Sequence, residues 1–505
     1  MADGLLNKAS IILTPTGYKA GTLYNVAPVV EPYEDFDFAR ASVASRVNSS
    51  GLVEMVGRTL GSELVTNGDF ATDSDWVKGT GWSIANGKAS SDGTQSTNSG
   101  FIQNSVFDNN KTYKLTFDLI SNGEVLKFWV NGTQFINSYS STDSYVVYIN
   151  TTTSGSAYFE ATADFIGSID NVSVKEVIDT NNIPRISYDS NGDNGHILLE
   201  PTSTNLIPFS EDFNSGWTQY GSPTINTSSI ISPDGTLNGS KITRGSNQTP
   251  LRYVNVAALN NEYTFSVYAK KGSVDSMFLD IGDVAQVEFT LTDEWQRFKV
   301  TQTPTTNKHV DISLGTSVSG DFIYIWGAQL EELPYATSYI PTLTGSTETR
   351  ATETATGAGS ADLINSTEGV LYAEIAALAN DQSERQISID DGSGNNRIIL
   401  RYNSTSNTIN AYLFNGSVQG GEFFHTLTDI TIFIKVAFKW KANDFALWVN
   451  GVEVGSDNSG TTFSADTLND ISFDFDGLYP FYGKCKALAV FNEALSDSEL
   501  TQLTT

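Results

Sequence analysis

The chain has 505 residues, of which 39% are hydrophobic and 11% aromatic, and its 58 acidic against 29 basic side chains leave a net charge of −29. This length exceeds what one hydrophobic core can serve and predicts about three domains. The negative charge repels phosphate backbones and acidic lipid surfaces, so we expect neither a nucleic-acid nor a membrane partner.

The N-terminal sequence and the cysteine count bear on where the protein is made. The first residues lack the basic start and apolar run of a signal peptide, and no stretch approaches the ~18 consecutive apolar residues of a membrane span. The single cysteine, Cys485, excludes a disulfide within the chain. We therefore expect synthesis in a cytosol, without export by the Sec route.

Short runs of alternating apolar and polar residues, bounded by Gly, Asn, Asp and Ser, recur along the chain, for example at residues 113–119 and 263–269. This period of two predicts β-strands. A helix is predicted at residues 496–503, where Ser496 and Glu499 have the spacing of a capping box. The sequence therefore predicts an all-β protein.

The N-terminal region is apolar in patches over residues 5–24 but too short to bury itself, so we expect it to dock onto a partner. Residues 38–54 (FARAS through LVE) and 183–206 (IPR through LLEPTSTNL) resemble one continuous segment of tailed-bacteriophage virion proteins. The resemblance implies that residues 1–61, continued at 178–204, form a small region that anchors the protein to a capsid, a tail or a neighbouring subunit.

Residues 62–177 interrupt this framework. They open with LVTNGDF followed by Trp76 and close with IDNVSV, and so resemble the jelly-roll carbohydrate-binding modules found beside xylanases and glucanases. The resemblance implies glycan binding and a structural Ca²⁺ held by Asp69 and Asp170. The alternative is that an Asp near a strand end only forms a turn.

A second copy of this pattern follows at residues 205–344. In it Trp217 takes the place of Trp76, and Tyr263 opens a strand midway as Tyr113 does in the first copy. The second copy resembles the phage variant of the same sandwich, so we expect two β-sandwiches in tandem. The two ends of an inserted domain must lie close together, so the strands near Leu64 and Val174 are expected to be neighbours.

A Thr-, Gly-, Ala- and Ser-rich linker is predicted at residues 345–361. The region after it, residues 362–505, resembles concanavalin A-like jelly rolls of the laminin G type, most clearly over LAVFNEALSDSEL at 488–500. The predicted fold is thus a series of tandem jelly-roll sandwiches with a small N-terminal anchoring region.

Sugar rings stack on exposed aromatic faces while their hydroxyls need polar partners. The candidates for such a platform are Trp76, Trp82, Trp129, Trp217 and Tyr220. The alternative for each tryptophan is a place in a core. Trp82, in the sequence GTGW, is expected to be the most exposed.

Catalytic patterns are missing from the sequence. Retaining glycosidases need two carboxylates about 5 Å apart, whereas Glu331 and Glu332 are adjacent and point to opposite faces of a strand. The three histidines, His196, His309 and His425, have no Cys or second His at ligand spacing, so we expect no zinc site. We therefore expect a protein that is not an enzyme.

Together these features predict a structural protein exposed on a bacteriophage particle, a head or tail fibre or decoration. It would display sandwiches that bind host or environmental glycans and would form a homo-oligomer, with a trimer favoured. One alternative is a polysaccharide depolymerase, which would need a carboxylate pair in a groove. Another is a secreted bacterial adhesin built of carbohydrate-binding modules, which an export signal or attachment motif would favour.

Overall fold

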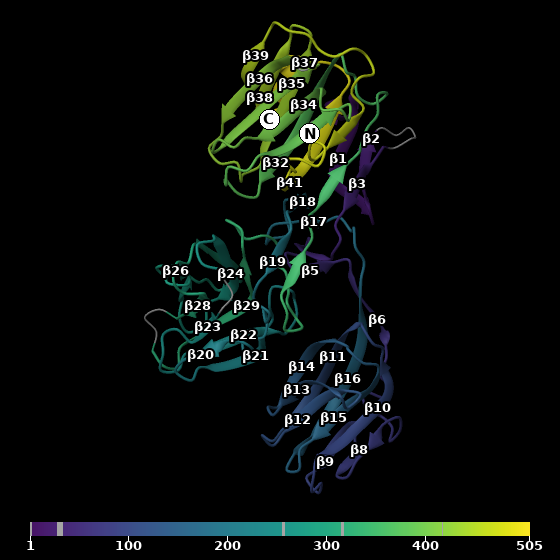
Figure 1. Cartoon of the computed structure of the whole chain (residues 1–505), viewed down its shortest axis with the longest axis vertical. Helices are drawn as coiled ribbons and strands as arrows, with labels where there is room; N and C mark the ends of the chain where they lie inside the picture. Colours follow the sequence, from purple (N-terminus) through teal and green to yellow (C-terminus); the bar gives the residue numbers. More distant parts are fainter. Residues whose placement is uncertain (1–2, 28–33, 255–257, 315–317, 417) are drawn as a thin grey trace.

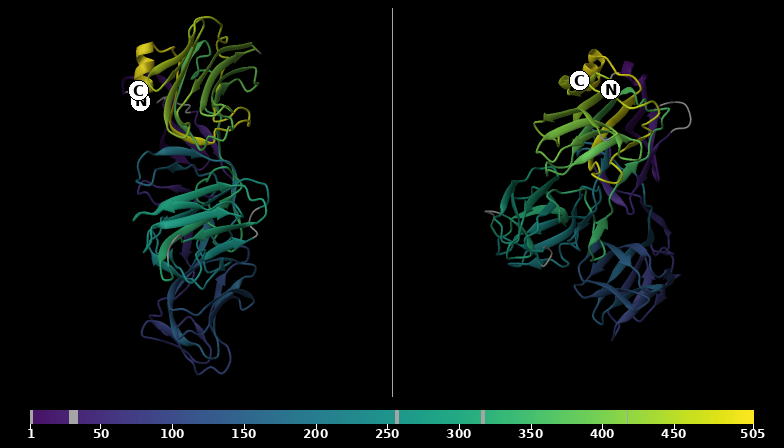
Figure 2. Two further views of the ribbon diagram at one scale, coloured as in Figure 1. Left: turned by 90° about the vertical axis from the view of Figure 1, so that its left-hand side faces the viewer. Right: turned by 45° about the horizontal axis from the view of Figure 1, so that its top comes forward.

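The structure is a computed structural model that describes residues 3–27, 34–254, 258–314, 318–416 and 418–505. The protein is all-β, with three separate β-sandwiches joined by a small base (Figure 1). The inserted sandwich and the C-terminal sandwich lie at opposite ends of the long axis, with the second sandwich between them (Figures 1 and 2).

Among the described residues, two short helices accompany the sheets, α1 (Asp3–Leu6) and α2 (Asp497–Thr504). The predicted C-terminal helix is confirmed, and its capping residue Ser496 donates its backbone N–H to Glu499 Oε2 at 2.8 Å. Neither of these helices, within the part of the chain that the structure describes, has the length and hydropathy to span a bilayer.

The inserted sandwich consists of two facing sheets. One sheet has the order β14 (Asp143–Asn150), β11 (Thr112–Ser121), β16 (Ile166–Asp179), β9 (Lys88–Asp92) and β8 (Trp82–Ala85), with β6 (Arg58–Glu63) also paired to β16. The other has the order β13 (Gln134–Tyr139), β12 (Leu126–Val130), β15 (Gly155–Ala161), β10 (Ser99–Phe107) and β7 (Val77–Lys78). Aromatic and aliphatic side chains from both sheets fill the core between them.

The second sandwich repeats this topology. Its sheets have the orders β27 (Gln296–Gln302), β24 (Tyr263–Lys270), β29 (Phe322–Glu331), β22 (Gly239–Thr243), β21 (Thr224–Ile230) and β26 (Val287–Thr290), β25 (Ser276–Ile281), β28 (His309–Ser313), β23 (Leu251–Val254), β20 (Thr218–Gln219). Every strand from β7 to β16 therefore has a counterpart in the same place of the second sandwich, so the two are copies of one topology.

The landmarks noted in the sequence have the same local role in both copies. The indole N–H groups of Trp76 and Trp217 each donate to a backbone oxygen eight or nine residues earlier, at 3.2 Å. The hydroxyls of Tyr113 and Tyr263 each accept from the backbone N–H five residues earlier, at 2.8 and 2.9 Å. The tryptophans thus tie the start of each sandwich to its core, and the tyrosines tie the loop before the middle strand.

The chain enters and leaves the inserted sandwich at the same place. The backbone N–H of Leu64 donates to the carbonyl of Val174 at 2.9 Å, which confirms the expected closeness of the two strands. Below them β6 continues alongside β16, with Arg58 opposite Asp179. The inserted sandwich is therefore connected to the base by a two-stranded stalk formed by β6 and β16.

The C-terminal sandwich packs a five-stranded sheet against a larger one. The first has the order β36 (Val418–Thr426), β35 (Thr408–Asn415), β34 (Asn396–Tyr402), β33 (Arg385–Asp390), β40 (Asp470–Ser472). The larger has the order β31 (Thr354–Thr356), β3 (Phe36–Ala39), β2 (Thr22–Ala27), β1 (Ala9–Lys19), β41 (Gly483–Phe491), β32 (Glu368–Ala377), β37 (Ile434–Lys441), β38 (Phe445–Val449), β39 (Val452–Asp457). β18 (His196–Leu199), which also pairs with β17 (Ile186–Ser187), joins β41.

The N-terminal strands thus belong to the C-terminal sandwich, and Figure 1 shows them as purple ribbons beside the yellow and green sheets. Ile12 lies opposite Ala489 of β41, and Ile11 and Leu13 are fully buried in the shared core. This corrects the expectation that residues 5–24 are too short to be buried without a partner, because the partner is the far end of the same chain. The predicted virion contact of residues 1–61 loses that support.

The two halves of the interrupted framework come together in the base. Strands β4 (Ala44–Val47) and β5 (Val53–Val56) pair with each other, as do β19 (Ser203–Asn205) and β30 (Glu348–Arg350). Between them lies a buried charge cluster, which consists of Arg40, Arg185, Glu200, Arg350 and Glu353, each no more than 2% exposed. All five come from the framework or the linker.

Candidate functional site

A row of apolar side chains crosses the outer face of one sheet of the inserted sandwich. Cross-strand pairing places Phe135 of β13 opposite Trp129 of β12, Trp129 opposite Tyr158 of β15, and Tyr158 opposite Ile102 of β10, which in turn is opposite Val77 of β7. These five residues, one from each strand, are called the aromatic row below.

The alternation of the strands turns this row outward. Phe101, Phe128 and Phe159 point into the core and are fully buried, so their neighbours in sequence point to the opposite face. With strands about 4.8 Å apart, a row across five strands is about 19 Å long.

The ends of the aromatic row are exposed and its middle is half-buried. Phe135 is 49% and Val77 55% exposed. The rings of Trp129 and Phe135 meet edge to face, with centroids 4.9 Å apart. Large rings held in fixed positions on an open face are suited to stacking against a flat, weakly polar ligand.

The indole N–H of Trp129 adds a directional feature. Its nitrogen is buried and has no hydrogen-bond partner among the residues that the structure describes. A buried donor left without an acceptor destabilises the protein by roughly 1–3 kcal/mol.

Polar side chains lie beside the aromatic row on the same face. Lys127 Nζ is 3.2 Å from Glu160 Oε1, and Asn98 Nδ2 donates to the same oxygen at 2.7 Å. Burial first, and Glu160 second, raise the pKa of Tyr158, so its hydroxyl stays protonated at neutral pH. The face thus offers an ammonium group, a carboxylate and a hydroxyl next to flat rings.

Gly100 lets the ring of Tyr158 lie across strand β10. A Cβ atom at position 100 would come within 2.5 Å of that ring, closer than side-chain atoms pack, so a larger residue would push Tyr158 away. The small residue and the exposed ring are parts of one surface.

Of the five aromatic candidates from the sequence, only Trp129 lies in this row. Trp76 and Trp217 are 6% and 5% exposed and fill equivalent core positions, so neither offers a face to a sugar. The expected exposure of Trp82 is wrong: the ring is 6% exposed and stacks on Phe101 with centroids 4.8 Å apart. The glycines before it form a turn that folds the ring inward.

Tyr220 is 37% exposed but belongs to the second sandwich, where the Arg252 guanidinium lies 5.6 Å from its ring centre. Phe135 was missed by sequence reasoning although it could have been found, because the Asn-Gly turn after Trp129 brings the two together across the hairpin. Tyr158 carries no comparable local signal.

The proposed calcium ligands are not brought into a cluster. Asp69 is exposed, and Asp170 lies within strand β16, where its Oδ1 accepts the backbone N–H of Asn171 at 2.7 Å. Within the described ranges, neither belongs to a group of three or more carboxylate, imidazole or thiol side chains close enough to share an ion. Calcium at these positions stays a prediction.

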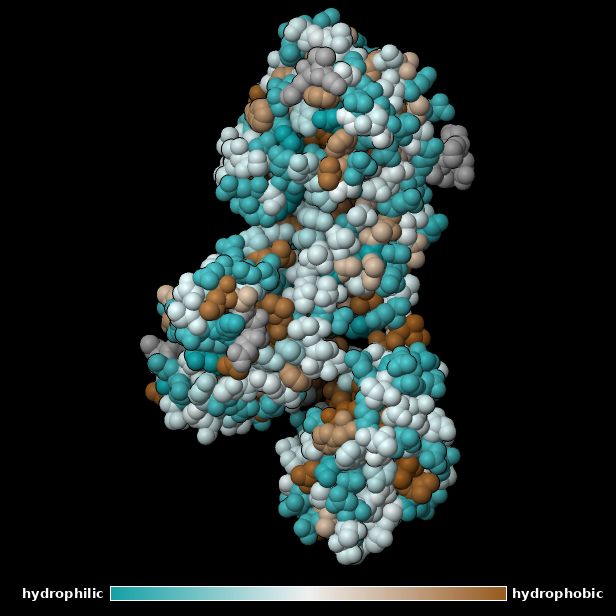
Figure 3. All heavy atoms as spheres, in the orientation of Figure 1, coloured by the Kyte–Doolittle hydropathy of each residue, from teal (hydrophilic) through white to brown (hydrophobic). Residues whose placement is uncertain are grey.

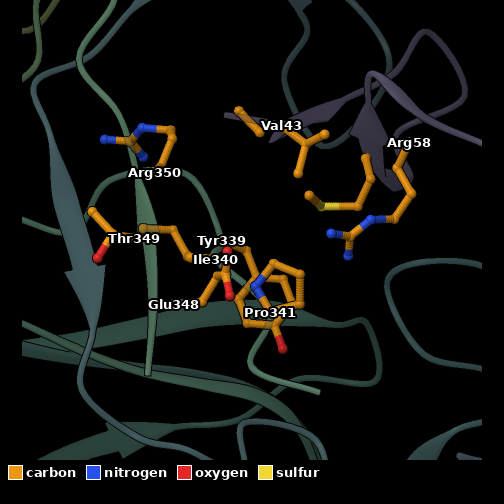
Figure 4. Close-up of a pocket in the computed structure, with 10 residues that line it drawn as sticks. Val43, Arg58, Tyr339, Ile340, Pro341, Glu348, Thr349 and Arg350 are labelled. Atoms are coloured by element: carbon orange, nitrogen blue, oxygen red, sulfur yellow. The ribbon is translucent and has the colours of Figure 1, made fainter. Parts of the chain in front are cut away.

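A pocket at the base is too small to be the site. Figure 4 shows it between Val43, Arg58 and the segment from Tyr339 to Pro341. Its volume is about 10 Å³, enough for one water molecule at most.

On the face turned toward the viewer in Figure 3, hydrophobic residues of the inserted sandwich form separate patches among hydrophilic ones.

Comparison with known proteins covers the C-terminal sandwich most directly. Residues 355–501 match the concanavalin A-like lectin/glucanases superfamily. The expected concanavalin A-like, laminin G-type domain is confirmed. No curated protein matches the chain in sequence.

Several solved structures are similar at low identity. The carbohydrate-binding module CBM40 of the Ruminococcus gnavus IT-sialidase, bound to α2,3-sialyllactose, is 19% identical over 30% of this chain and 94% of its own, with a TM-score of 0.26. The CBM22 tandem of Paenibacillus barcinonensis Xyn10C is 11% identical over 54% and 98%, with a TM-score of 0.20. Domains LG4–5 of the mouse laminin α1 chain are 10% identical over 57% and 93%, with a TM-score of 0.21.

Other similar structures are covered only in part. The chain spans 23% of a leech intramolecular trans-sialidase and 24% of NanB.

Proposed function

We propose that the protein binds carbohydrate chains without cleaving them and that the inserted sandwich holds the glycan across the aromatic row. The observation that carries this proposal is the alignment of Phe135, Trp129 and Tyr158 on one open sheet face, with an indole N–H that has no partner among the described residues. Pyranose faces stack on such rings. The polar pair Lys127 and Glu160 lies where ring hydroxyls would project.

The dimensions of the row favour a chain over a single sugar. A pyranose is roughly as wide as one strand spacing of ~4.8 Å, so the row matches several linked rings lying across the strands. The face is open at both ends, because Phe135 and Val77 are exposed. An internal stretch of a polysaccharide can therefore lie on it without a chain end.

The test is affinity electrophoresis of the full chain in gels that contain soluble polysaccharides. A Trp129→Ala variant is expected to be retarded less than the wild type, with an affinity for the polysaccharide at least tenfold lower. The matched control is Phe424→Ala, which removes a ring that is 56% exposed on the C-terminal sandwich. The proposal fails if Trp129→Ala is retarded as strongly as the wild type, or if no polysaccharide retards the wild type.

The finer proposal is that this glycan-binding chain is displayed on a bacteriophage particle as a head or tail fibre or decoration, made in the host cytoplasm and assembled as a trimer. Its support is the resemblance of residues 38–54 and 183–206 to phage virion proteins. Electron microscopy of particles labelled with an antibody to the C-terminal sandwich would place it, and light scattering would give the copy number. Unlabelled particles would argue against the role.

A further inference from the structure

The second sandwich carries a different row at the positions equivalent to the aromatic row. Asp280 of β25 lies opposite Asp311 of β28, Asp311 opposite Arg252 of β23, and Arg252 opposite Thr218 of β20. In the first copy the corresponding strands pair Trp129, Tyr158, Ile102 and Val77 in the same order. One topology therefore presents stacking rings in one copy and charged groups in the other.

Three potential metal ligands converge in this charged row. His309 is two residues from Asp311 on β28, so both side chains leave the same face of the sheet. The Nε2 atom of His309 lies 3.7 Å from Asp311 Oδ2 and 4.0 Å from Asp280 Oδ2. Among the described residues, these three form the group whose ligand atoms all lie within 4.8 Å of one another.

The Nε2 atom of His309 faces both carboxylates and reaches neither of them. Distances of 3.7 and 4.0 Å are too long for hydrogen bonds, yet His309 is only 8% exposed, Asp280 4% and Asp311 3%. Arg252 offsets the charge of Asp311, and a cation held between the three groups would compensate the second buried carboxylate, that of Asp280.

We propose that Asp280, His309 and Asp311 bind a divalent transition-metal ion, with zinc the best fit, on the outer face of the second sandwich. One imidazole and two carboxylates are ligands that zinc accepts, with water completing a tetrahedron. Zinc bonds of 2.0–2.2 Å place tetrahedral ligands roughly 3.4 Å apart. The two separations from His309 Nε2, 3.7 and 4.0 Å, exceed this by 0.3 to 0.6 Å, so the side chains must rotate inward to close the site.

The neighbouring residues hold the carboxylates in position. Arg252 donates from Nε and Nη2 to the two oxygens of Asp311, both at 2.6 Å. Gln286 Nε2 donates to Asp280 Oδ1 at 2.8 Å. The other oxygen of the Asp280 carboxylate, Oδ2, faces His309. Each carboxylate oxygen has two lone pairs, so Asp311 can accept from Arg252 and bind an ion at once.

The test is calorimetric titration of the full, EDTA-treated chain with zinc chloride. The wild type is expected to bind one ion and to gain in melting temperature. Asp280→Asn, which keeps the shape of the side chain, and His309→Gln, which keeps a polar side chain of similar length, should each weaken binding by at least tenfold. The matched control His425→Gln alters a half-buried histidine of the C-terminal sandwich and should bind as the wild type does.

Cobalt(II) provides a readout on the unaltered protein in case the variants misfold. A single site with nitrogen and oxygen ligands should show the visible absorption of tetrahedral cobalt, and zinc should displace it. The proposal is overturned if the wild type binds no stoichiometric zinc, if cobalt remains octahedral, or if folded Asp280→Asn and His309→Gln bind zinc as tightly as the control.

Discussion

Arg185 and Glu353 lie 168 positions apart in the sequence and form a two-point ion pair in which both side chains are fully buried. Arg185 Nε donates to Glu353 Oε1 at 2.9 Å, and Nη2 donates to the other carboxylate oxygen. Glu200 accepts from Arg185 at 2.9 Å and forms an ion pair with Arg350, also at 2.9 Å. Arg185 and Glu200 also hydrogen-bond to Ser338, so this cluster joins the base to the second sandwich and to the linker.

Removing Arg185 should be strongly destabilising. An Arg185→Ala change leaves Glu353 and Glu200 with fewer partners in a buried site, at a cost of about 3–5 kcal/mol. Differential scanning calorimetry should show a large fall in the melting temperature of the base and the C-terminal sandwich. Lys441→Ala is the control, because its ion pair with Glu368 is exposed and the melting temperature should stay unchanged. An equal fall in melting temperature for the two variants would contradict a stabilising role of the buried charge cluster.

Acid should weaken the buried charge cluster. Burial alone would raise the pKa of Glu200, but Arg350 and Arg185 together outweigh it and lower the pKa to about 2 from an ordinary value of 4.5. Because the folded pKa is depressed, the stabilisation is present above pH 4.5 and is lost as the pH falls toward 2. Thermal unfolding between pH 2 and 6 should show this loss. A Glu200→Gln variant should have a lower, flatter profile, and an unchanged slope would count against the assignment.

Deleting residues 1–27 should damage the opposite end of the chain. Strand β1 pairs with β41, and Ile11 and Leu13 fill the core of the C-terminal sandwich. Leu13→Ala alone should cost about 2–5 kcal/mol. Limited proteolysis should cut the truncated chain first within residues 362–505. A truncated protein as resistant as the wild type would show that β1 is dispensable.

The inserted sandwich should be removable without loss of the rest. Joining residue 63 to residue 175 through an Asn-Gly turn keeps the β6 and β16 pairing, since Glu63 already lies opposite Lys175. The shortened chain should keep the melting transition of the other sandwiches and lose polysaccharide retardation. Retained retardation would place the glycan site elsewhere.

Gly100→Ala should weaken glycan binding without unfolding the protein. The added methyl group meets the ring of Tyr158, so the ring must leave the aromatic row, and we expect a several-fold loss of affinity in the same gels. Gly420→Ala is the control, because a Cβ atom there meets nothing within 4 Å. Unchanged affinity in Gly100→Ala would exclude Tyr158 from the site.

The sequence by itself determined the strands, their turns and the internal repeat. Alternation along 113–119 and 263–269, the Asn-Gly turn after Trp129 and the paired landmarks Trp76 and Trp217 are local patterns, and local patterns decide local structure. Tertiary structure alone decided that β1 completes the C-terminal sandwich and that Trp82 turns inward. It also brought Tyr158 beside Trp129, and His309 beside Asp280. These outcomes depend on which strands lie side by side, and sheet pairing joins residues whose separation in sequence carries no signal of their contact.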